Sequence, residues 1–228
     1  EEEHARWLAR EDLLLPLVKG YCSEKAYELL SLSLQTFGGS GYTQDYPIEQ
    51  YIRDARIDSL YEGTTAIQAL DLLFRKIVRD QGTTLTWLAD QIRAFIKAGG
   101  DHDAFADERQ RLATALDEVQ GHLGVLIQHA MASQDEAQRE RIYTSGLHAT
   151  ALLESLAEVT IGWLLLRHAE IADEQLEVGT AGGDEDFYRG KVASARWFAR
   201  HVLPKVALRR QEADEEDGAI MQLPAEAF

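Results

Sequence analysis

Apolar and polar positions alternate with a helical period along almost the whole chain. Apolar residues recur at i, i+3 and i+4, and we find no clear alternation of the kind that marks strands. In the first third of the chain the pattern predicts helices over 13–37, 48–61 and from Thr64 or Thr65 to about Asp80. The residues predicted to face inward are Ala26, Leu29, Leu30, Leu34, Phe37, Ile52, Ala55, Leu60, Ile67, Leu70, Phe74, Ile77 and Val78.

The rest of the chain predicts longer helices with short connections. We expect them over 84–98, 103–132, 135–171 and 187–210, with an acidic linker over 173–186 and a frayed acidic tail after Gln211. Within 103–132 the inward face consists of Phe105, Leu112, Leu116, Val119, Leu123 and Ile127. The pattern indicates an all-α fold, an antiparallel helix bundle with an additional helical block. We place the domain boundary near residue 81, which gives domains 1–81 and 82–228.

Two short segments differ from ordinary bundle sequence. Gly38 and Gly39 are predicted to end a helix, because glycine tolerates the left-handed geometry of a C-cap, and they would let a ligand approach the backbone closely. A plain helix-to-helix turn explains the same residues. The second segment places Glu62 at a break between helices, followed by Gly63 and a new helix N-terminus, which favours anions. A carboxylate there could act as a general base; a first-turn Glu beside a threonine cap is the simpler alternative.

Composition and charge narrow the function classes. Hydrophobic residues make up 45% of the 228 residues and charged residues 27%, as in ordinary globular proteins. A net charge of −16 argues against phosphate contacts with nucleic acid. The longest apolar run, 159–166, falls short of the ~20 residues that span a bilayer, so we expect no stable membrane insertion. The single cysteine, Cys22, fits a reducing compartment, and we expect a cytoplasmic location.

The two segments, in this order and spacing, resemble the C-terminal signature of the acyl-CoA dehydrogenases. The resemblance rests on residues 34–42, 45–49, 53–57 and 61–65, with no apparent gap. The later block resembles the helical C-terminal extension of a longer subgroup of that family. The residues that carry this second resemblance are Tyr188, Lys191, Ala195, Arg196, Phe198, Leu203 and Pro204.

The resemblance implies a reaction and a set of site residues. The family oxidises an acyl-CoA thioester to trans-2-enoyl-CoA with FAD, and a glutamate at the position matched by Glu62 removes the α-proton. Gly63 would permit the close approach of the substrate. Thr64, Thr65 and Ala66 fall where the family contacts FAD at the start of a helix, Ala66 through its backbone alone. A further segment matches one that reaches the adenine-diphosphate part of FAD on a neighbouring subunit: Gln35, Thr36, Phe37, Gly38 and Gly39.

The resemblance also implies partners and an incomplete chain. It implies acyl-CoA as substrate, electron-transfer flavoprotein as electron acceptor, a role of the fatty-acid β-oxidation type and a homodimer or homotetramer. The family's helical and β domains that precede this part are absent from 1–228, so we expect the chain to be the C-terminal portion of a longer enzyme. The alternative is a non-catalytic helical oligomerisation module, or an inactive fragment that lacks the flavin domains. Such a module would need neither Glu62 nor the Gly38-Gly39 pair.

The remaining histidines and basic residues are not predicted to form a metal site or a catalytic site. His122 and His129 lie seven residues apart on one predicted helix face but lack further ligands at metal-binding spacing, so we predict no metal site. Four arginines are interpreted as surface charges: Arg109, Arg111, Arg139 and Arg141. The basic cluster of Lys205, Arg209 and Arg210 could meet a CoA phosphate, although a solvated helix end explains it more simply.

Overall fold

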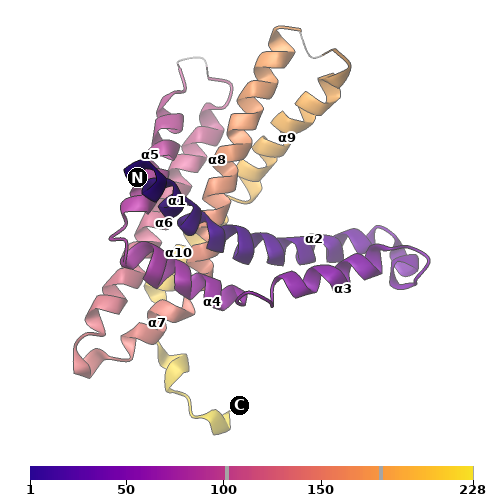
Figure 1. Cartoon of the computed structure of the whole chain (residues 1–228). Helices are drawn as coiled ribbons and strands as arrows, with labels where there is room; N and C mark the ends of the chain where they lie inside the picture. The colour runs from indigo at the N-terminus through magenta and orange to yellow at the C-terminus, as the bar shows by residue number, and fades with distance from the viewer. Residues whose placement is uncertain (101–102, 180–181, 228) are drawn as a thin grey trace. The chain divides into compact units, whose positions relative to one another are not determined.

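The computed structural model of the chain describes residues 1–100, 103–179 and 182–227. It divides into two compact units, Glu1–Leu85 (unit 1) and Thr86–Phe228 (unit 2). Every regular element among the described residues is helical, which confirms the predicted all-α class (Figure 1). The division falls inside helix α5 (Thr83–Lys97).

Unit 1 begins with a continuous helical run made of α1 (Glu2–Pro16), η1 (Leu17–Cys22) and α2 (Ser23–Gln35). The predicted start at residue 13 was therefore wrong, and the acidic first turn of α1 favours the earlier start through the helix dipole. Pro16 cannot donate a backbone hydrogen bond. The helix continues past it because the backbone widens into the π-helical turn η1 rather than breaking.

The second half of unit 1 holds η2 (Gly38–Tyr42), α3 (Ile48–Asp58), α4 (Thr65–Leu70) and η3 (Asp71–Val78). Helices α2 and α3 form an antiparallel hairpin (Figure 1). The buried apolar side chains of unit 1 lie mainly on the other elements: Leu13, Leu17, Tyr21, Ile48, Ala69, Leu72, Leu73 and Ile77. Several residues predicted to face a core are exposed instead: Ala26, Leu29, Phe37, Leu60, Ile67 and Val78. Two paired helices bury only the faces that they turn toward each other, so the outer faces of the hairpin stay open.

Unit 2 is a bundle of longer helices, and its central element is α8. Its elements after α5 are α6 (Ala106–Ala132), η4 (Glu136–Gln138), α7 (Arg141–Leu147), α8 (Ala149–Glu177), η5 (Gly182–Asp184), α9 (Glu185–His201), α10 (Lys205–Glu215), η6 (Ala219–Gln222) and η7 (Ala225–Ala227). Helix α8 packs against α6 and α9. By length and composition it could cross a membrane, yet 56% of its apolar window is buried inside the bundle, as in the core helix of a globular domain.

Two predicted helices of unit 2 are each divided in the structure. The helix expected over 135–171 is broken at His148, where the Ser145 hydroxyl donates to the Leu126 carbonyl (2.8 Å) and holds the end of α7 against α6. The helix expected over 187–210 stops at His201 and restarts after Pro204, because proline would clash with the preceding helical turn. Helix α10 continues to Glu215, so the tail after Gln211 is partly helical.

The linker and part of the core of unit 2 differ from the prediction. The first part of the linker expected over 173–186 belongs to α8, and residues 180–181 lie outside the described part of the chain. Phe105, Leu112, Leu116 and Val119 are buried as predicted. Leu123 and Ile127 are only half-buried. The residues directly before them, His122 and Leu126, are fully buried instead.

Charged residues predicted to lie on the surface of unit 2 are partly buried in ion pairs. Arg109 is only 5% exposed and pairs with Asp103 at 2.6 Å and with Glu170. Arg209, expected at a solvated helix end, donates through both terminal nitrogens to the buried carboxylate of Glu158 (2.6 and 3.1 Å). The surface interpretation was wrong for these arginines because each has a carboxylate partner on the distant helix α8, Glu170 for Arg109 and Glu158 for Arg209.

Candidate functional site

The turn between α3 and α4 has an unusual backbone at Glu62 and Gly63. Glu62 has φ of 53°, and Gln81 is the only other non-glycine residue with positive φ in the described chain. This left-handed conformation costs an L-residue about 1–2 kcal/mol, and such strained positions gather at functional sites. Gly63 follows with φ of 95°, a value that glycine tolerates. Two consecutive left-handed residues reverse the chain sharply and present Glu62 at the bend.

A side chain from the next helix holds this turn in place. The Gln68 amide nitrogen donates to the backbone carbonyl of Glu62 at 2.9 Å. A Cβ atom at Gly63 would lie 3.1 Å from that same nitrogen, so Gly63 is required for space as well as for conformation. Sequence reasoning did not identify Gln68, although its position in the first turns of α4 was a signal that it can reach back.

Glu24 on α2 bonds to residues on both sides of the turn, one on α3 and one on α4. The Thr65 hydroxyl donates to one of its carboxylate oxygens at 2.7 Å, and Arg56 lies 3.4 Å from the other. The Arg56 guanidinium also lies 5.0 Å from the centre of the Tyr27 ring. Arg56 therefore has a structural role that joins α3 to α2.

The predicted residues Thr64, Thr65 and Ala66 lie directly beside Glu62. Thr64 is the N-cap residue of α4, with φ of −62° and ψ of 164°, and Thr65 is the first helical residue. The Thr64 side chain makes no cap hydrogen bond, contrary to the expected cap, and the Thr65 hydroxyl bonds to Glu24 instead. The N-cap side chain therefore does not satisfy the first backbone N–H groups of α4, which lie next to the exposed side chains of Glu62, Thr64 and Ala66.

The second predicted segment forms the other end of the α2–α3 hairpin. Helix α2 ends at Gln35, and Thr36, Phe37, Gly38 and Gly39 continue it as an exposed turn. Gly38 has φ of 57°, the left-handed geometry expected at a helix end. Added Cβ atoms at Gly38 or Gly39 would meet nothing within 4 Å, so this backbone is open to a ligand.

The structure does not bring these two segments together within the chain. The glycine turn precedes α3 and the Glu62 turn follows it, so the whole of α3, 11 residues and about 16 Å long, lies between them. Gly41, which was not singled out as a site residue, fixes the glycine turn, because a Cβ there would lie 2.7 Å from the Leu34 carbonyl oxygen.

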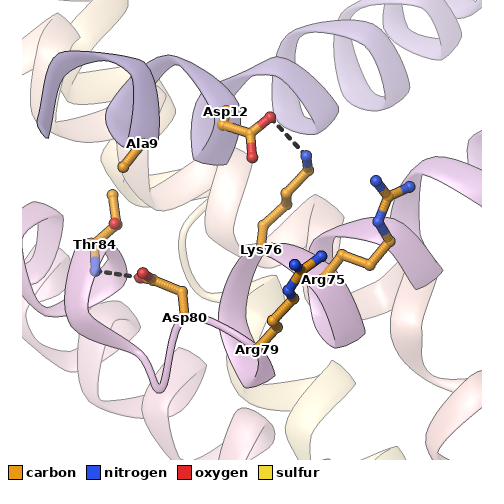
Figure 2. A pocket seen from close by; sticks show the side chains of 7 residues that line it. All are labelled: Ala9, Asp12, Arg75, Lys76, Arg79, Asp80 and Thr84. Atoms are coloured by element: carbon orange, nitrogen blue, oxygen red, sulfur yellow. Dashed lines mark hydrogen bonds and ion pairs between the residues drawn. The ribbon is translucent and has the colours of Figure 1, made fainter. Parts of the chain in front are cut away.

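A polar cavity of about 280 Å³ lies elsewhere in unit 1 (Figure 2). It is lined by Ala9, Asp12, Arg75, Lys76, Arg79, Asp80 and Thr84. Lys76 pairs with Asp12 at 2.6 Å, and the Asp80 carboxylate accepts the Thr84 backbone N–H at 2.7 Å. None of the predicted site residues lines this cavity, so it is separate from the Glu62 turn.

Matches to known protein families identify the class of protein to which this chain belongs. Residues 4–76 match the family described as acyl-CoA dehydrogenase, C-terminal domain, and residues 88–224 match the family described as acetyl-CoA dehydrogenase C-terminal like. The chain belongs to the acyl-CoA dehydrogenase family.

Curated relatives agree with this assignment. The chain is 49% identical over 217 residues to the broad-specificity linear acyl-CoA dehydrogenase FadE5 of Mycobacterium tuberculosis, a match that covers 95% of this chain and 35% of the relative. It is 37% identical over 203 residues to 3-methylmercaptopropionyl-CoA dehydrogenase of Ruegeria pomeroyi, covering 89% of this chain and 33% of the relative. The chain thus spans about a third of the length of these relatives.

The fold is also similar to that of an acyl-CoA dehydrogenase from Bacillus anthracis solved in complex with FAD. The TM-score is 0.62 at 17% sequence identity, and the match covers 92% of this chain and 34% of that chain. At this identity the likeness concerns the fold.

Proposed function

We propose that this chain is the C-terminal portion of an FAD-dependent acyl-CoA dehydrogenase in which Glu62 is the catalytic base. The reaction is the α,β-dehydrogenation of an acyl-CoA thioester to trans-2-enoyl-CoA, of the fatty-acid β-oxidation type. The observation that carries the proposal is the left-handed Glu62–Gly63 turn directly before α4. The acyl-CoA dehydrogenase names of the relatives support the substrate class.

The chemistry assigned to this turn is proton abstraction. The Glu62 carboxylate takes the proton from the carbon α to the thioester carbonyl, and the released electron pair forms the new double bond. FAD, when bound, accepts the hydride that leaves the β carbon. The Glu62 backbone N–H polarises the thioester carbonyl, and Gly63 lets the substrate approach. Glu62 is exposed in this chain, so the flavin, the acyl chain and the rest of the enzyme supply the apolar surroundings that strengthen a carboxylate as a base.

The described residues fit an approach by FAD at both ends of the hairpin. At Thr64, Thr65 and Ala66 the start of α4 offers backbone N–H groups that no side chain caps. At the other end, Gln35, Thr36, Phe37, Gly38 and Gly39 form an exposed turn with open space beside its glycines. Because α3 separates the two turns, we assign them to two different FAD molecules, the second bound to a neighbouring subunit of a homodimer or homotetramer.

The open outer faces of the α2–α3 hairpin support the assignment to a larger enzyme. Large apolar side chains exposed on or beside these helices include Leu29, Leu32, Tyr51, Ile57 and Leu60. An apolar surface of this kind is usually covered by another domain or subunit. We therefore assign residues 1–81 to the family's C-terminal helical domain and 82–228 to an extension, with electron-transfer flavoprotein as the electron acceptor of the whole enzyme.

The decisive experiment uses the full-length protein that contains this chain. Replacing the carboxylate with an amide, Glu62→Gln, should leave FAD bound but slow its bleaching by acyl-CoA about 10²–10⁴-fold, because the base is lost. The matched control is Glu28→Gln, since Glu28 is an exposed carboxylate on α2 that pairs only locally with Lys25. Bleaching at the parental rate in Glu62→Gln would place the base elsewhere. Absence of flavin from the parent protein would favour the oligomerisation module.

A further inference from the structure

Unit 2 contains a surface groove of about 450 Å³ that the proposed dehydrogenase chemistry does not use. It lies along one face of α9 and is closed on one side by the end of α8. The lining consists of Asp173, Leu176, Arg189, Val192, Ala193, Arg196, Trp197, Arg200 and His201. Its volume falls in the range of small-molecule sites, about 300–1,000 Å³.

The apolar part of the groove centres on Trp197. This side chain is 59% exposed, and its ring contacts His201 at a centroid distance of 5.3 Å. Leu176 and Val192 add aliphatic surface to the same lining. An exposed indole beside aliphatic side chains offers a ligand a substantial apolar contact surface.

The polar part of the groove holds three guanidinium groups and the carboxylate of Asp173. Two of the guanidinium groups have carboxylate partners outside the lining, Glu108 for Arg200 and Glu185 for Arg189. Arg196 is therefore the guanidinium whose charge can attract an anion into the groove.

Contacts with α6 and the residues before it fix two of the three guanidinium groups. Arg200 pairs with the buried carboxylate of Glu108 at 3.0 Å. Arg196 donates to the Ala104 carbonyl at 3.2 Å and lies 5.3 Å from the centre of the Phe105 ring, so both of these partners are uncharged. Each hydrogen bond uses one nitrogen of a group with five N–H donors, which leaves the positive charge of Arg196 for an anion to balance.

We propose that this groove binds an amphipathic anion, a fatty carboxylate whose chain lies against Trp197 and whose head group meets Arg196 and Arg189. The carboxylate matches the planar fork of a guanidinium, and the chain matches the aliphatic and indole lining. The same chemistry is available from a free fatty acid or from an anionic lipid surface. The size of the groove favours the single free molecule.

The test is a titration of the full-length protein with decanoate, followed through the fluorescence of Trp197. Decanoate should change the emission saturably, Trp197→Phe should remove that change, and 1-decanol should bind at least about tenfold more weakly because it lacks the charge. Arg196→Ala and Arg189→Ala should each weaken decanoate binding about tenfold. Arg189 pairs with Glu185 one helical turn away on the same helix, so its replacement preserves the bundle even where Arg196→Ala destabilises it.

Controls separate this site from the catalytic turn and from a membrane contact. Arg139→Ala removes an exposed arginine of unit 2 outside the groove and should leave decanoate binding unchanged. Bleaching of FAD by acyl-CoA should be unaffected in Arg189→Ala. Equal binding of decanoate in the parent and in both groove variants, or equal binding of 1-decanol, would overturn the proposal. Arginine-dependent binding to phosphatidylglycerol vesicles without decanoate binding would also overturn it in favour of a lipid surface.

Discussion

Units 1 and 2 are both helical, yet they bury their apolar side chains differently. The largest fully buried side chains are mostly in unit 2, on α5, α6 and α8, while unit 1 contributes Leu13, Leu72, Leu73 and Ile77. Large exposed apolar side chains are denser in unit 1, where many of them lie on the α2–α3 hairpin. The unit that carries the candidate catalytic turn thus leaves a larger share of its large apolar side chains exposed than unit 2 does.

The ion pair between the buried Glu158 and Arg209 gives the first test of this difference between the units. Replacing Glu158, which is 2% exposed, with Gln should cost about 1.5–3 kcal/mol of unfolding free energy, because Arg209 loses a charged hydrogen-bond acceptor and keeps the more exposed Glu154, 3.2 Å away, as an ion-pair partner. The matched change Glu49→Gln removes an exposed pair with Arg53 in unit 1 and should cost less than about 0.5 kcal/mol. Urea denaturation of the 228-residue chain measures both, and equal costs would contradict the contrast between the units.

Two leucine substitutions test whether apolar side chains are buried in unit 2 and exposed on the hairpin of unit 1. Leu153→Ala in the centre of α8 should destabilise the chain by about 2–5 kcal/mol, because it leaves a cavity in the core of unit 2. Leu32→Ala on the open face of α2 should change stability by less than about 0.5 kcal/mol. The same urea experiment reads out both variants. A large cost for Leu32→Ala would show that the hairpin face is already covered in this chain.

The stability of unit 2 should also depend on pH through His122. This side chain is fully buried, neither ring nitrogen has a hydrogen-bond partner among the described residues, and burial, with His148 nearby, lowers its pKa from 6.5 to about 4. Between these values the unfolded chain binds a proton that the folded chain does not. Stability is therefore complete above pH 6.5 and declines toward pH 4, by about 3 kcal/mol in total.

The variant His122→Leu isolates this contribution. It cannot take up a proton, so the loss of stability between pH 7 and pH 4.5 should become shallower than in the parent chain. The measurement is the urea midpoint at several pH values. An unchanged slope would assign the acid sensitivity to other groups.

The smallest predicted effect concerns the strained turn of unit 1. Glu62→Gly relieves the left-handed strain at φ of 53° and should raise the unfolding free energy by about 0.5–1 kcal/mol. The same substitution should abolish bleaching of FAD in the full-length protein, because it removes the proposed base. A gain in stability coupled to a loss of activity is expected where strain serves function. A destabilised Glu62→Gly variant would mean that the carboxylate holds the turn.

The local features of the fold could be predicted from the sequence, but the long-range ones could not. Helical periodicity identified the elements, and glycine chemistry placed the breaks at Gly38 and Gly63. Pro204 is a residue that breaks helices. The apolar residues on both sides of it nevertheless recur with a helical period, so the sequence predicted one continuous helix where the structure has α9 and α10. The charges of Arg109 and Arg209 resembled surface charges because nothing in the neighbouring sequence shows that a partner arrives from a distant helix.

In the candidate site, too, the sequence predicted the residues that are neighbours along the chain but not the long-range contacts that hold them. Glu62, Gly63 and Thr64 are neighbours in sequence and lie together in the structure. The residues that hold their turn, Gln68 and Glu24, act through side-chain contacts that the sequence pattern does not encode. The catalytic and cofactor roles of the turn remain predictions until the substitutions above are measured.

The buried guanidinium of Arg109 has a consequence for how unit 2 evolves. It contacts Asp103 before α6, Glu170 late in α8 and the backbone carbonyl of Phe95 in α5, so three segments share one positive charge. A shortened version that lost α8 would leave this charge enclosed without its second carboxylate, at a cost of several kcal/mol. Gene truncations inside unit 2 should therefore be selected against, and we expect related proteins to keep or lose this unit as a whole.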